Sequence, residues 1–505
     1  MSPRPDLRPS LEEVQRLAGQ GGTVPVYREI LADLETPASA YLKVGGGSGT
    51  FLLESVEGGE QVGRYSFVGF DPSLRIELGE GVATLRGGHG VEQVAFTDPT
   101  RLLDELVGQR GCVKPRTLPR FVGGAVGYLS YEMVRYFERL PAPATDPLGL
   151  PLGQLLVVDT LIVFDHLRRT ILVVTHVPLA GDLRHEYAAA QERIERVIAR
   201  LRRPLEARVA SPGSGNGGSA GWLSNQSQAQ FEAMVRRAKE YIAAGDVIQV
   251  VLSQRLSRRT EADPFDVYRA LRVINPSPYM FFLDFGDTQL VGASPELLTL
   301  VENGVIASHP IAGTRPRGAT PEEDQRLAEE LCQDEKERAE HVMLVDLSRN
   351  DVGRVSVPGS VRVTSLMHIE RYSHVMHLVS RVNGTLRPDV RPLQALRACF
   401  PHGTVSGAPK IRAMEIIAEL EGEARGPYAG CAGFVGFDGE LEMAITLRTI
   451  VMHRGTAYVQ VGAGIVADSD PTLEYQETLN KGAALIRAVE AGERLHEGLL
   501  PAGRR

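Results

Sequence analysis

Cysteine, tryptophan and lysine are scarce in this sequence of 505 residues, which holds four cysteines and one tryptophan. The cysteines lie far apart and form no CxxC pair, at Cys112, Cys332, Cys399 and Cys431. This spacing argues against a zinc cluster and against a disulfide framework, so we expect reduced thiols in the core. The scarcity of lysine narrows any search for a lysine base to Lys43, Lys114, Lys239, Lys336, Lys410 and Lys481.

Long apolar runs and an excess of positive charge are also missing. No stretch reaches the roughly 18 apolar residues of a membrane span. The amino-terminal segment MSPRPDLRPSLEEVQRL lacks the apolar core of a signal peptide. The net charge of -8 gives no general attraction for nucleic acid or for anionic membranes. We therefore expect a cytoplasmic protein with neither a nucleic-acid partner nor a membrane partner.

A segment rich in Pro, Gly and Ser at 203–221 divides the chain. Such a composition has little apolar surface to bury and is typical of a flexible linker. We predict an amino-terminal extension at 1–20, a folded region at 21–202, a second folded region at 222–490 and a tail at 491–505. Strands and helices are mixed without regular βαβ alternation, which predicts an α+β fold.

Local patterns predict individual elements on both sides of the linker. Apolar, β-branched runs at 155–164 and 171–177 flank a short polar turn and are typical of a hairpin. Asp182 can cap a helix that carries Ile194 and Leu201 on its apolar face. After the linker, a helical pattern begins near Phe231 and ends at Gly245, before a strand at 247–256.

Two pairs of glutamates have helical spacing. Glu337 and Glu340 lie three residues apart, as do Glu474 and Glu477, so each pair can project from one face of a helix. Either pair alone is common on a solvated helix face. If the fold brings the two pairs together, they make a site of hard oxygen ligands suited to Mg2+.

The string VQVGAGIVADSDP contains the spacing of a dinucleotide fingerprint, in Gly462, Gly464 and Ala467. A dinucleotide-binding turn must run straight into a helix, whereas Asp468 to Pro471 interrupts this segment. The pattern favours instead a backbone nest whose N–H groups meet a carboxylate.

Several strings occur in one order between Gln249 and Lys481: INPSPYMFF, GASPELL, PIAGTRPRG, EKERAEHVMLVDLSRND, PHGTVSGAPK and VQVGAGIVADSDPTLEYQET. Together they resemble the chorismate-utilising enzymes. Upstream, FLLES, RYSFVGF and GGAVGYLSYEMVRYFE are similar to the amino-terminal half of anthranilate synthase large subunits. The resemblance implies stacked, largely antiparallel β-sheets with helices packed outside. It also implies a regulatory and partner-contacting region at 21–202 and a chorismate-binding catalytic region at 222–490.

Two positions separate the members of this family. Ala312 stands where aminodeoxychorismate synthases carry a lysine nucleophile, and alanine cannot attack the ring. Gln249 stands where isochorismate and salicylate synthases carry a lysine that activates water, and glutamine is a poor base. The resemblance therefore implies that ammonia attacks chorismate, giving anthranilate and pyruvate in tryptophan biosynthesis. A catalytically silent binding relative, the alternative of another class, is disfavoured by the intact set of candidate site residues.

The resemblance also implies roles for charged residues. Glu340 and Glu477 would be the Mg2+ ligands, with Glu337 and Glu474 holding metal-bound water beside them. Glu296 would be the general acid that protonates the departing hydroxyl, although an acid after Pro295 can also simply begin a helix.

His377 would act in the loss of pyruvate, either as an orienting group or as a proton carrier; its alternative is a core histidine. Arg448 would bind the enolpyruvyl carboxylate, unless it makes a structural ion pair. By resemblance the substrate-binding residues are Gly313, Thr314, Thr404, Tyr428, Arg448, Gly462, Ala463, Gly464 and Lys481.

Two strings are similar to the halves of a tryptophan regulatory site. Glu54 and Ser55 in LLES would meet the charged ends of the amino acid, and Pro278, Tyr279 and Met280 would line an indole pocket. Each string also has an ordinary structural interpretation, as a strand end or as a stiff turn. Their joint occurrence implies feedback inhibition by L-tryptophan.

No cysteine is accompanied by the His and Glu pair of a glutaminase. We therefore expect a separate glutamine amidotransferase subunit, anthranilate synthase component II, to supply ammonia within a heterotetramer.

Overall fold

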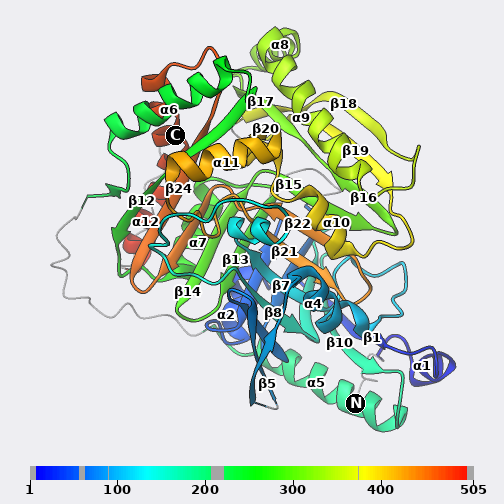
Figure 1. Cartoon of the computed structure of the whole chain (residues 1–505). Coiled ribbons are helices and arrows are strands. Elements are labelled where there is room, and N and C mark those ends of the chain that lie inside the picture. The colour runs from blue at the N-terminus through cyan, green and yellow to red at the C-terminus, as the bar shows by residue number, and fades with distance from the viewer. Residues whose placement is uncertain (1–6, 56–62, 89, 206–220, 373–374, 497–505) are drawn as a thin grey trace.

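A computed structural model describes residues 7–55, 63–88, 90–205, 221–372 and 375–496 of the chain. Most of the predicted linker, 206–220, and the end of the predicted tail, 497–505, lie outside the described residues. The described strands form two 12-stranded sheets, with the helices outside them (Figure 1). Every pairing between named strands in the described ranges is antiparallel. The predicted α+β class with antiparallel sheets is confirmed.

The strands of the first sheet, in spatial order, are β1 (Thr23–Leu31), β10 (Thr170–Pro178), β9 (Thr160–Asp165), β3 (Tyr65–Gly69), β2 (Thr50–Glu54), β13 (Tyr279–Asp284), β14 (Thr288–Ser294), β23 (Thr449–His453), β24 (Thr456–Ile465), β12 (Gln249–Arg259) and β11 (Leu223–Ser224), with β20 (Gly407–Ala408) paired to β12. The strands of the second sheet are β17 (Ile311–Pro316), β19 (Val375–Thr385), β16 (Val305–Ser308), β15 (Leu297–Glu302), β22 (Leu441–Ile445), β21 (Cys431–Gly436), β7 (Gly124–Leu129), β8 (Gly153–Val158), β4 (Leu74–Leu78), β5 (Val82–Gly87) and β6 (Gly90–Ala95), with β18 (Arg362–Arg371) paired to β19.

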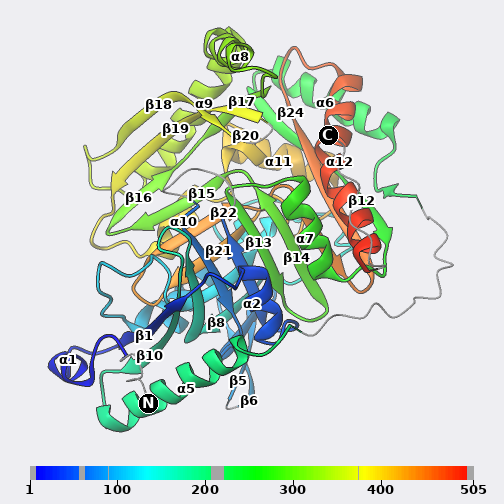
Figure 2. The ribbon, with the colours of Figure 1, turned by 180° about the vertical axis from the view of Figure 1, so that it is seen from behind.

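The helices cover the outer faces of the two sheets. They are α1 (Leu11–Arg16), α2 (Pro37–Lys43), α4 (Pro99–Leu106), α5 (Leu183–Leu201), α6 (Gln228–Ala243), α7 (Pro264–Ile274), α8 (Pro321–Gln333), α9 (Glu335–Gly353), α10 (Pro392–Cys399), α11 (Lys410–Glu421) and α12 (Pro471–His496), with short 3-10 turns η1 (Gly108–Arg110), η2 (Tyr131–Tyr136) and η3 (Gly403–Val405). Figure 2 shows α2, α5, α7 and α12 lying over the first sheet. No helix within the described ranges is both long and apolar enough to cross a membrane.

Strands from both sides of the predicted linker share both sheets. In the first sheet β2 pairs with β13, and in the second sheet β7 pairs with β21. An apolar core between the sheets contains the aromatic rings of Phe67, Phe121 and Phe434, which pack edge to face or tilted against one another. The segment at 203–221 therefore separates two stretches of sequence but not two layers of structure.

Several local predictions agree with the structure and one is wrong. Asp182 caps α5, since its side chain accepts hydrogen bonds from the backbone N–H groups of Arg184 and His185. The run at 155–164 is not one strand, because the chain leaves β8 in the second sheet and enters β9 in the first sheet at Asp159. Only β9 and β10 form the expected hairpin. At the carboxyl end, α12 continues to His496, past the predicted start of the tail.

A buried ion pair joins elements that are distant in sequence. The Arg425 guanidinium, only 1% exposed, donates through Nε and Nη2 to the Glu421 carboxylate over 2.8 and 2.6 Å. It also donates to the carbonyl oxygens of Val405 and Val251 over 2.8 Å each. The Glu132 carboxylate, from η2 in the amino-terminal half, accepts the backbone N–H of Arg425 over 2.7 Å. This network fixes α11, β12 and the turn at η3 to one another and to the amino-terminal half.

We predict that Arg425→Met lowers the free energy of unfolding by about 3–5 kcal/mol, because it leaves the Glu421 carboxylate buried without its cation. The double variant Arg425→Met/Glu421→Leu should recover part of that loss, since neither charge is then buried alone. Urea unfolding followed by fluorescence measures both effects. As a control, Arg237→Met breaks a pair with Glu240 in which both side chains are at least half exposed, and it should leave the unfolding midpoint nearly unchanged. Equal losses in Arg425→Met and Arg237→Met would contradict the prediction.

Candidate active site

Glu296 lies buried, 2% exposed, between β14 and β15. Thr404 Oγ1 donates a hydrogen bond to Glu296 Oε1 over 2.9 Å, and the backbone N–H of Ile311 also donates to this carboxyl group. Burial raises the pKa of Glu296 to about 8, against the opposing effect of the two hydrogen bonds. A carboxyl group that keeps its proton at neutral pH can act as a general acid.

Strand β17 has a bulge at Gly313, because its register with β19 shifts between Ala312 and Thr314. Gly313 has a φ of +68°, and a Cβ there would lie 2.9 Å from the Leu331 side chain and 3.2 Å from Glu337 Oε2. Glycine is therefore required at this position. Ala312 is buried and directly follows Ile311, whose backbone N–H donates to Glu296. Because alanine has only a methyl side chain, the strand supplies no nucleophile at this position.

The bulge places two groups of β17 on His377. His377 Nδ1 lies 3.1 Å from the Gly313 carbonyl oxygen and 3.0 Å from Thr314 Oγ1. A carbonyl oxygen only accepts, so Nδ1 carries the proton and Nε2 keeps a lone pair. Burial, together with the positive charge of Arg448, lowers the pKa of His377 to about 4. The ring is therefore neutral at physiological pH and can accept a proton at Nε2.

The first acidic pair lies on α9. Gln249 Nε2 donates to Glu340 Oε1 over 3.2 Å, and Arg315 Nη1 donates to Glu337 Oε1 over 3.3 Å. Burial raises the pKa of Glu340, and the neighbouring negative charge of Glu337 acts in the same direction. Glu340 is thus held by an amide and has no arginine or lysine in direct contact among the described residues.

The second acidic pair lies on α12, where Lys481 Nζ is 2.6 Å from Glu477 Oε1. Burial raises the pKa of Glu474, as it does for Glu340 on α9. The positive charges of Lys336 on α9 and Lys481 on α12 each lower the pKa of both carboxyl groups. The same two lysines, one on each helix, therefore lie within electrostatic range of both Glu340 and Glu474.

The oxygen donors on the two helices suit a hard cation. The described part of the chain has no preassembled group of three or more His, Cys, Asp or Glu side chains that could hold a metal ion. Mg2+ needs fewer protein ligands than that, because it retains waters and takes one or two carboxylates together with substrate oxygens. Glu340 on α9 and Glu477 on α12 offer two such carboxylates.

The glycines of the VGAG string lie in strand β24 rather than in a backbone nest. Gly462 and Gly464 pair with Ser253 and Val251 of β12, whereas the pairing of β24 with β23 ends at Val459. A Cβ on Gly462 would lie 2.6 Å from Tyr428 Oη, and a Cβ on Gly464 would lie 2.6 Å from Gln249 Nε2. The two glycines therefore make room for polar side chains of the site.

Lys481 and Ala463 both lie at β24 but make different contacts there. Lys481 Nζ donates to the Gly462 carbonyl oxygen over 3.1 Å, which anchors α12 to β24. The Ala463 side chain packs in the apolar cluster beneath α6 and α11. Ala463 can therefore meet a ligand only through its backbone.

Arg448 stands between β22 and β23 with a φ of +46°, a conformation that is unfavourable for a residue other than glycine. Burial lowers the pKa of its guanidinium, and no carboxylate of the described residues pairs with it. A desolvated cation without a partner destabilises a protein unless a ligand supplies the opposite charge. The geometry of Arg448 therefore suits a carboxylate of the substrate.

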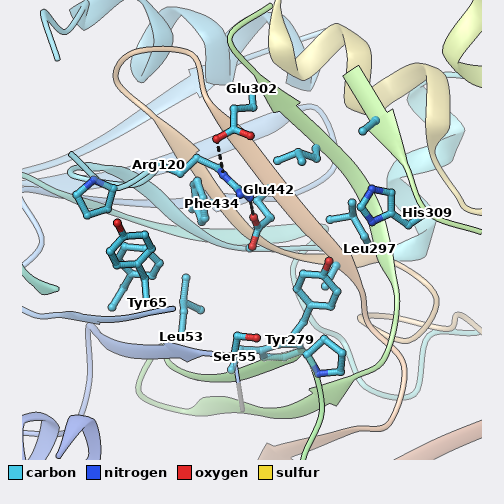
Figure 3. A pocket seen from close by; sticks show the side chains of 18 of the residues that line it. Leu53, Ser55, Tyr65, Arg120, Tyr279, Leu297, Glu302, His309, Phe434 and Glu442 are labelled. Carbon is cyan, nitrogen blue, oxygen red and sulfur yellow. Dashed lines mark hydrogen bonds and ion pairs between the residues drawn. The ribbon is translucent and has the colours of Figure 1, made fainter. Parts of the chain in front are cut away.

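A separate cavity of about 660 Å³ opens between the two sheets and is lined by all of the residues predicted for tryptophan, namely Glu54, Ser55, Pro278, Tyr279 and Met280. Figure 3 shows the side chains of Ser55 and Tyr279 pointing into it, opposite Arg120 and Phe434. Arg120 crosses the wall of the cavity and pairs with Glu302 and Glu442. The cavity is large enough for an aromatic amino acid.

Two of the predicted side chains point away from that cavity, because successive residues of a strand face opposite sides of a sheet. The Glu54 carboxylate accepts the Tyr268 hydroxyl over 2.5 Å and lies 3.2 Å from Arg272 on α7. Met280 packs in the same apolar core beneath α7. Glu54 and Met280 therefore line the cavity through their backbone.

The structure adds His402, which the sequence did not single out. The side chain of His402 is 4% exposed, and its Nδ1 lies 3.5 Å from Glu296 Oε1. Its place in PHGT, two residues before Thr404, was the available signal, but only the fold brings it to Glu296.

The chain as a whole is similar to proteins of known family. A family model described as chorismate binding enzyme matches residues 49–487. Anthranilate synthase component 1 from Acetivibrio thermocellus is 47% identical over 96% of this chain and 99% of its own length. The chain belongs to the anthranilate synthase component I family of chorismate-binding enzymes. Anthranilate synthase component 1 from Thermus thermophilus is 50% identical over 93% of this chain and 98% of its own length.

Solved structures agree with this assignment. Anthranilate synthase component I from Streptococcus pneumoniae TIGR4 is 39% identical, with a TM-score of 0.75, over 90% of this chain and 99% of that chain. The menaquinone-specific isochorismate synthase from Escherichia coli, at 20% identity and a TM-score of 0.66 over 95% of this chain and 98% of that chain, shares the fold. The family resemblance inferred from the motifs is confirmed. The site roles remain predictions, which the geometry above makes specific.

We predict opposite effects of Arg448→Met on stability and on substrate affinity. Removing a half-buried cation without a partner should leave the melting temperature unchanged or raise it. Losing a charged hydrogen bond to a carboxylate, worth about 1.5–3 kcal/mol, should raise the KM for chorismate by roughly 10- to 100-fold. Thermal unfolding without substrate and steady-state kinetics measure the two quantities.

The matched control is Arg258→Met, because Arg258 is similarly buried but pairs with Glu490 and Glu493. That variant should lose stability and keep its KM. A fall in melting temperature for Arg448→Met without any change in KM would show a structural role instead.

Proposed function

We propose that this chain is the synthase component of an anthranilate synthase, which converts chorismate and ammonia to anthranilate and pyruvate. The observation that carries this proposal is the joint presence of Ala312 and Gln249 in a site whose other residues suit chorismate. Neither side chain can attack the ring or activate water, so the nucleophile must come from outside. Relatives that are 47% and 50% identical over nearly the full chain carry the same name.

In the first step, ammonia adds to the ring carbon ortho to the ring carboxylate as the ring hydroxyl leaves. Glu296 donates its proton to that hydroxyl, which departs as water. Arg448 holds the enolpyruvyl carboxylate with its planar guanidinium. Thr404 orients the acid, because its hydroxyl donates to Glu296 Oε1.

In the second step, the aminated ring loses pyruvate and becomes aromatic. The ring must give up a proton, and His377 Nε2 is a neutral acceptor whose orientation is fixed by the Nδ1–H bond to the Gly313 carbonyl oxygen. This geometry favours the role of proton carrier over that of a mere orienting group.

Glu340 and Glu477 would hold Mg2+, while Glu337 and Glu474 would bind water beside it. The bound cation would supply positive charge for the ring carboxylate of chorismate in a site where the four glutamates otherwise repel it. Lys481, which now pairs with Glu477, would help to balance this charge.

Ammonia would come from a separate glutamine amidotransferase subunit. A glutaminase needs a cysteine thiolate as nucleophile. Burial raises the pKa of Cys112, Cys399 and Cys431 to about 12, so these thiols stay protonated. Cys332 packs beside a small apolar cluster under α8. None of the cysteines is placed for glutamine hydrolysis.

We predict that the purified chain forms anthranilate from chorismate, Mg2+ and ammonium salt but not from chorismate, Mg2+ and glutamine. Anthranilate fluorescence and mass spectrometry identify the product. Chelation with EDTA should abolish the reaction, and added Mg2+ should restore it. Release of isochorismate or of an aminodeoxychorismate as the final product would refute the proposed function. Turnover with glutamine in the rigorously purified chain would refute the need for a partner.

We also propose that L-tryptophan inhibits the enzyme by binding in the 660 Å³ cavity. Tyr279 and Phe434 offer aromatic surface for an indole ring. The cavity wall is covalently continuous with the proposed general acid, because Leu297 lines the cavity and is the residue after Glu296. In addition, Tyr279 is the register partner of Ser294, two residues before Glu296.

This continuity gives tryptophan a physical route to the active site. The backbone carbonyl of Glu296 accepts the Ile445 N–H over 3.0 Å, and Ala444 lines the cavity beside it. An occupant that displaces β15 or β22 therefore moves the Glu296 backbone. Inhibition requires that tryptophan prefer the displaced conformation, and reciprocity then requires that chorismate weaken tryptophan binding.

Ser55→Phe is expected to fill the cavity and to abolish tryptophan inhibition while keeping synthase activity, since Ser55 lies outside the chorismate site. Calorimetric titration should show loss of tryptophan binding, and the uninhibited rate of the same variant serves as its internal control. Inhibition and binding that persist unchanged in Ser55→Phe would place the regulatory site elsewhere.

A further inference from the structure

His402 is a buried titratable group that none of the steps above uses. It is the residue before η3, and its Nδ1 accepts the backbone N–H of Thr404 over 3.3 Å. The same nitrogen lies 3.0 Å from Thr404 Oγ1 and 3.5 Å from Glu296 Oε1. On the other side of the ring, Nε2 lies 3.5 Å from the hydroxyl of Ser308 on β16.

These contacts fix the proton of the imidazole. A backbone N–H can only donate, so Nδ1 must present its lone pair to Thr404 and the ring proton must be on Nε2, facing Ser308. Ser308 in turn donates to Ser348 on α9 over 3.4 Å. The charged groups around the ring are Glu296 and Lys410, whose ammonium pairs with Asp351 over 2.6 Å. Burial, followed by the charge of Lys410, lowers the pKa of His402 to about 3, in agreement with a neutral ring.

The unprotonated Nδ1 therefore lies 3.5 Å from Oε1 of Glu296 and has no proton to donate to it. An ionised Glu296 would place negative charge beside this electron-rich nitrogen inside a buried site, whereas a protonated Glu296 would not. Thr404 Oγ1, which contacts both groups, couples their orientations. No cation of the described residues contacts Glu296 to stabilise its ionised form.

We propose that His402 is a positioning residue that keeps Glu296 in its protonated form and holds the Thr404 hydroxyl in place, so that Glu296 is ready to act as the acid of the first step. This inference rests on the proposed role of Glu296. His402 itself does not contact substrate and transfers no proton.

The test compares two variants that both preserve the capping bond to Thr404. In His402→Asn, Oδ1 takes the place of Nδ1, so an acceptor still faces Glu296. In His402→Ser, Oγ can accept the Thr404 N–H, because serine is a good capping residue, but no acceptor replaces Nδ1 beside Glu296. The measurement is kcat/KM for chorismate against pH, with free ammonia held constant.

Because Glu296 must be protonated, activity is present below its pKa and is lost as pH rises through it. Wild type should therefore lose activity around pH 8. His402→Ser should move this midpoint to lower pH by about one unit, which corresponds to a tenfold larger acid dissociation constant of Glu296. His402→Asn should keep the midpoint, and kcat in His402→Ser should fall at high pH while the KM changes little.

The result that would overturn the proposal is a loss of activity by the same factor at every pH in His402→Ser, or an equal shift in both variants. Circular dichroism and the melting temperature establish whether each variant folds. If His402→Ser does not fold, a shifted midpoint in His402→Asn would still contradict the proposal.

Glu296→Gln separates this proposal from the role of Glu296 itself. That variant should lose activity by roughly 10²- to 10⁴-fold at every pH, as expected for removal of a general acid. Near-normal activity in Glu296→Gln would refute the role of Glu296 regardless of how the His402 variants behave.

Discussion

The buried pair of Arg425 and Glu421 is the constraint on which the active site depends. Two charges that are removed from water must be paired and fully hydrogen-bonded, or folding loses several kcal/mol. Here the Arg425 guanidinium also donates to carbonyl oxygens of β12 and η3, and a carboxylate from the amino-terminal half accepts the backbone N–H of Arg425. The turn that holds His402 and Thr404, and the strand that holds Gln249, are therefore fixed by the same interaction.

The proposed substrate site shows the opposite condition, since its ionisable groups are partly or fully removed from water without partners of opposite charge. Arg448 has no carboxylate partner among the described residues, Glu296 is neutral because of burial, and His377 is neutral as well. Such groups destabilise the unliganded protein, and a ligand of opposite charge would offset that cost. The proposed substrate, a dicarboxylate with a departing hydroxyl, would supply these partners.

The interleaved sheets explain how the cavity between them and the candidate active site come to share one wall. Strands from the amino-terminal half line one side of the cavity, and β15 and β22 line the other. Since Glu296, the proposed general acid, immediately precedes β15, a change in the spacing of the sheets would reach it without a long relay. The covalent continuity of the chain from Leu297 to Glu296 makes this coupling direct.

The sequence by itself determined the family, the fold class and the candidate site residues, because short strings such as PIAGTRPRG and PHGTVSGAPK are local and keep their order along the chain. It also determined Ala312 and Gln249, whose chemistry depends only on the identity of the side chain. What it could not give is which side chains face one another, because that depends on strand register and on contacts between distant segments. Only the tertiary structure decided that Glu54 turns toward Arg272 instead of the cavity, that Gly462 and Gly464 lie in a strand instead of a nest, and that His402 faces Glu296. Each of these is set by packing across the two sheets, to which residues far apart in the sequence contribute together.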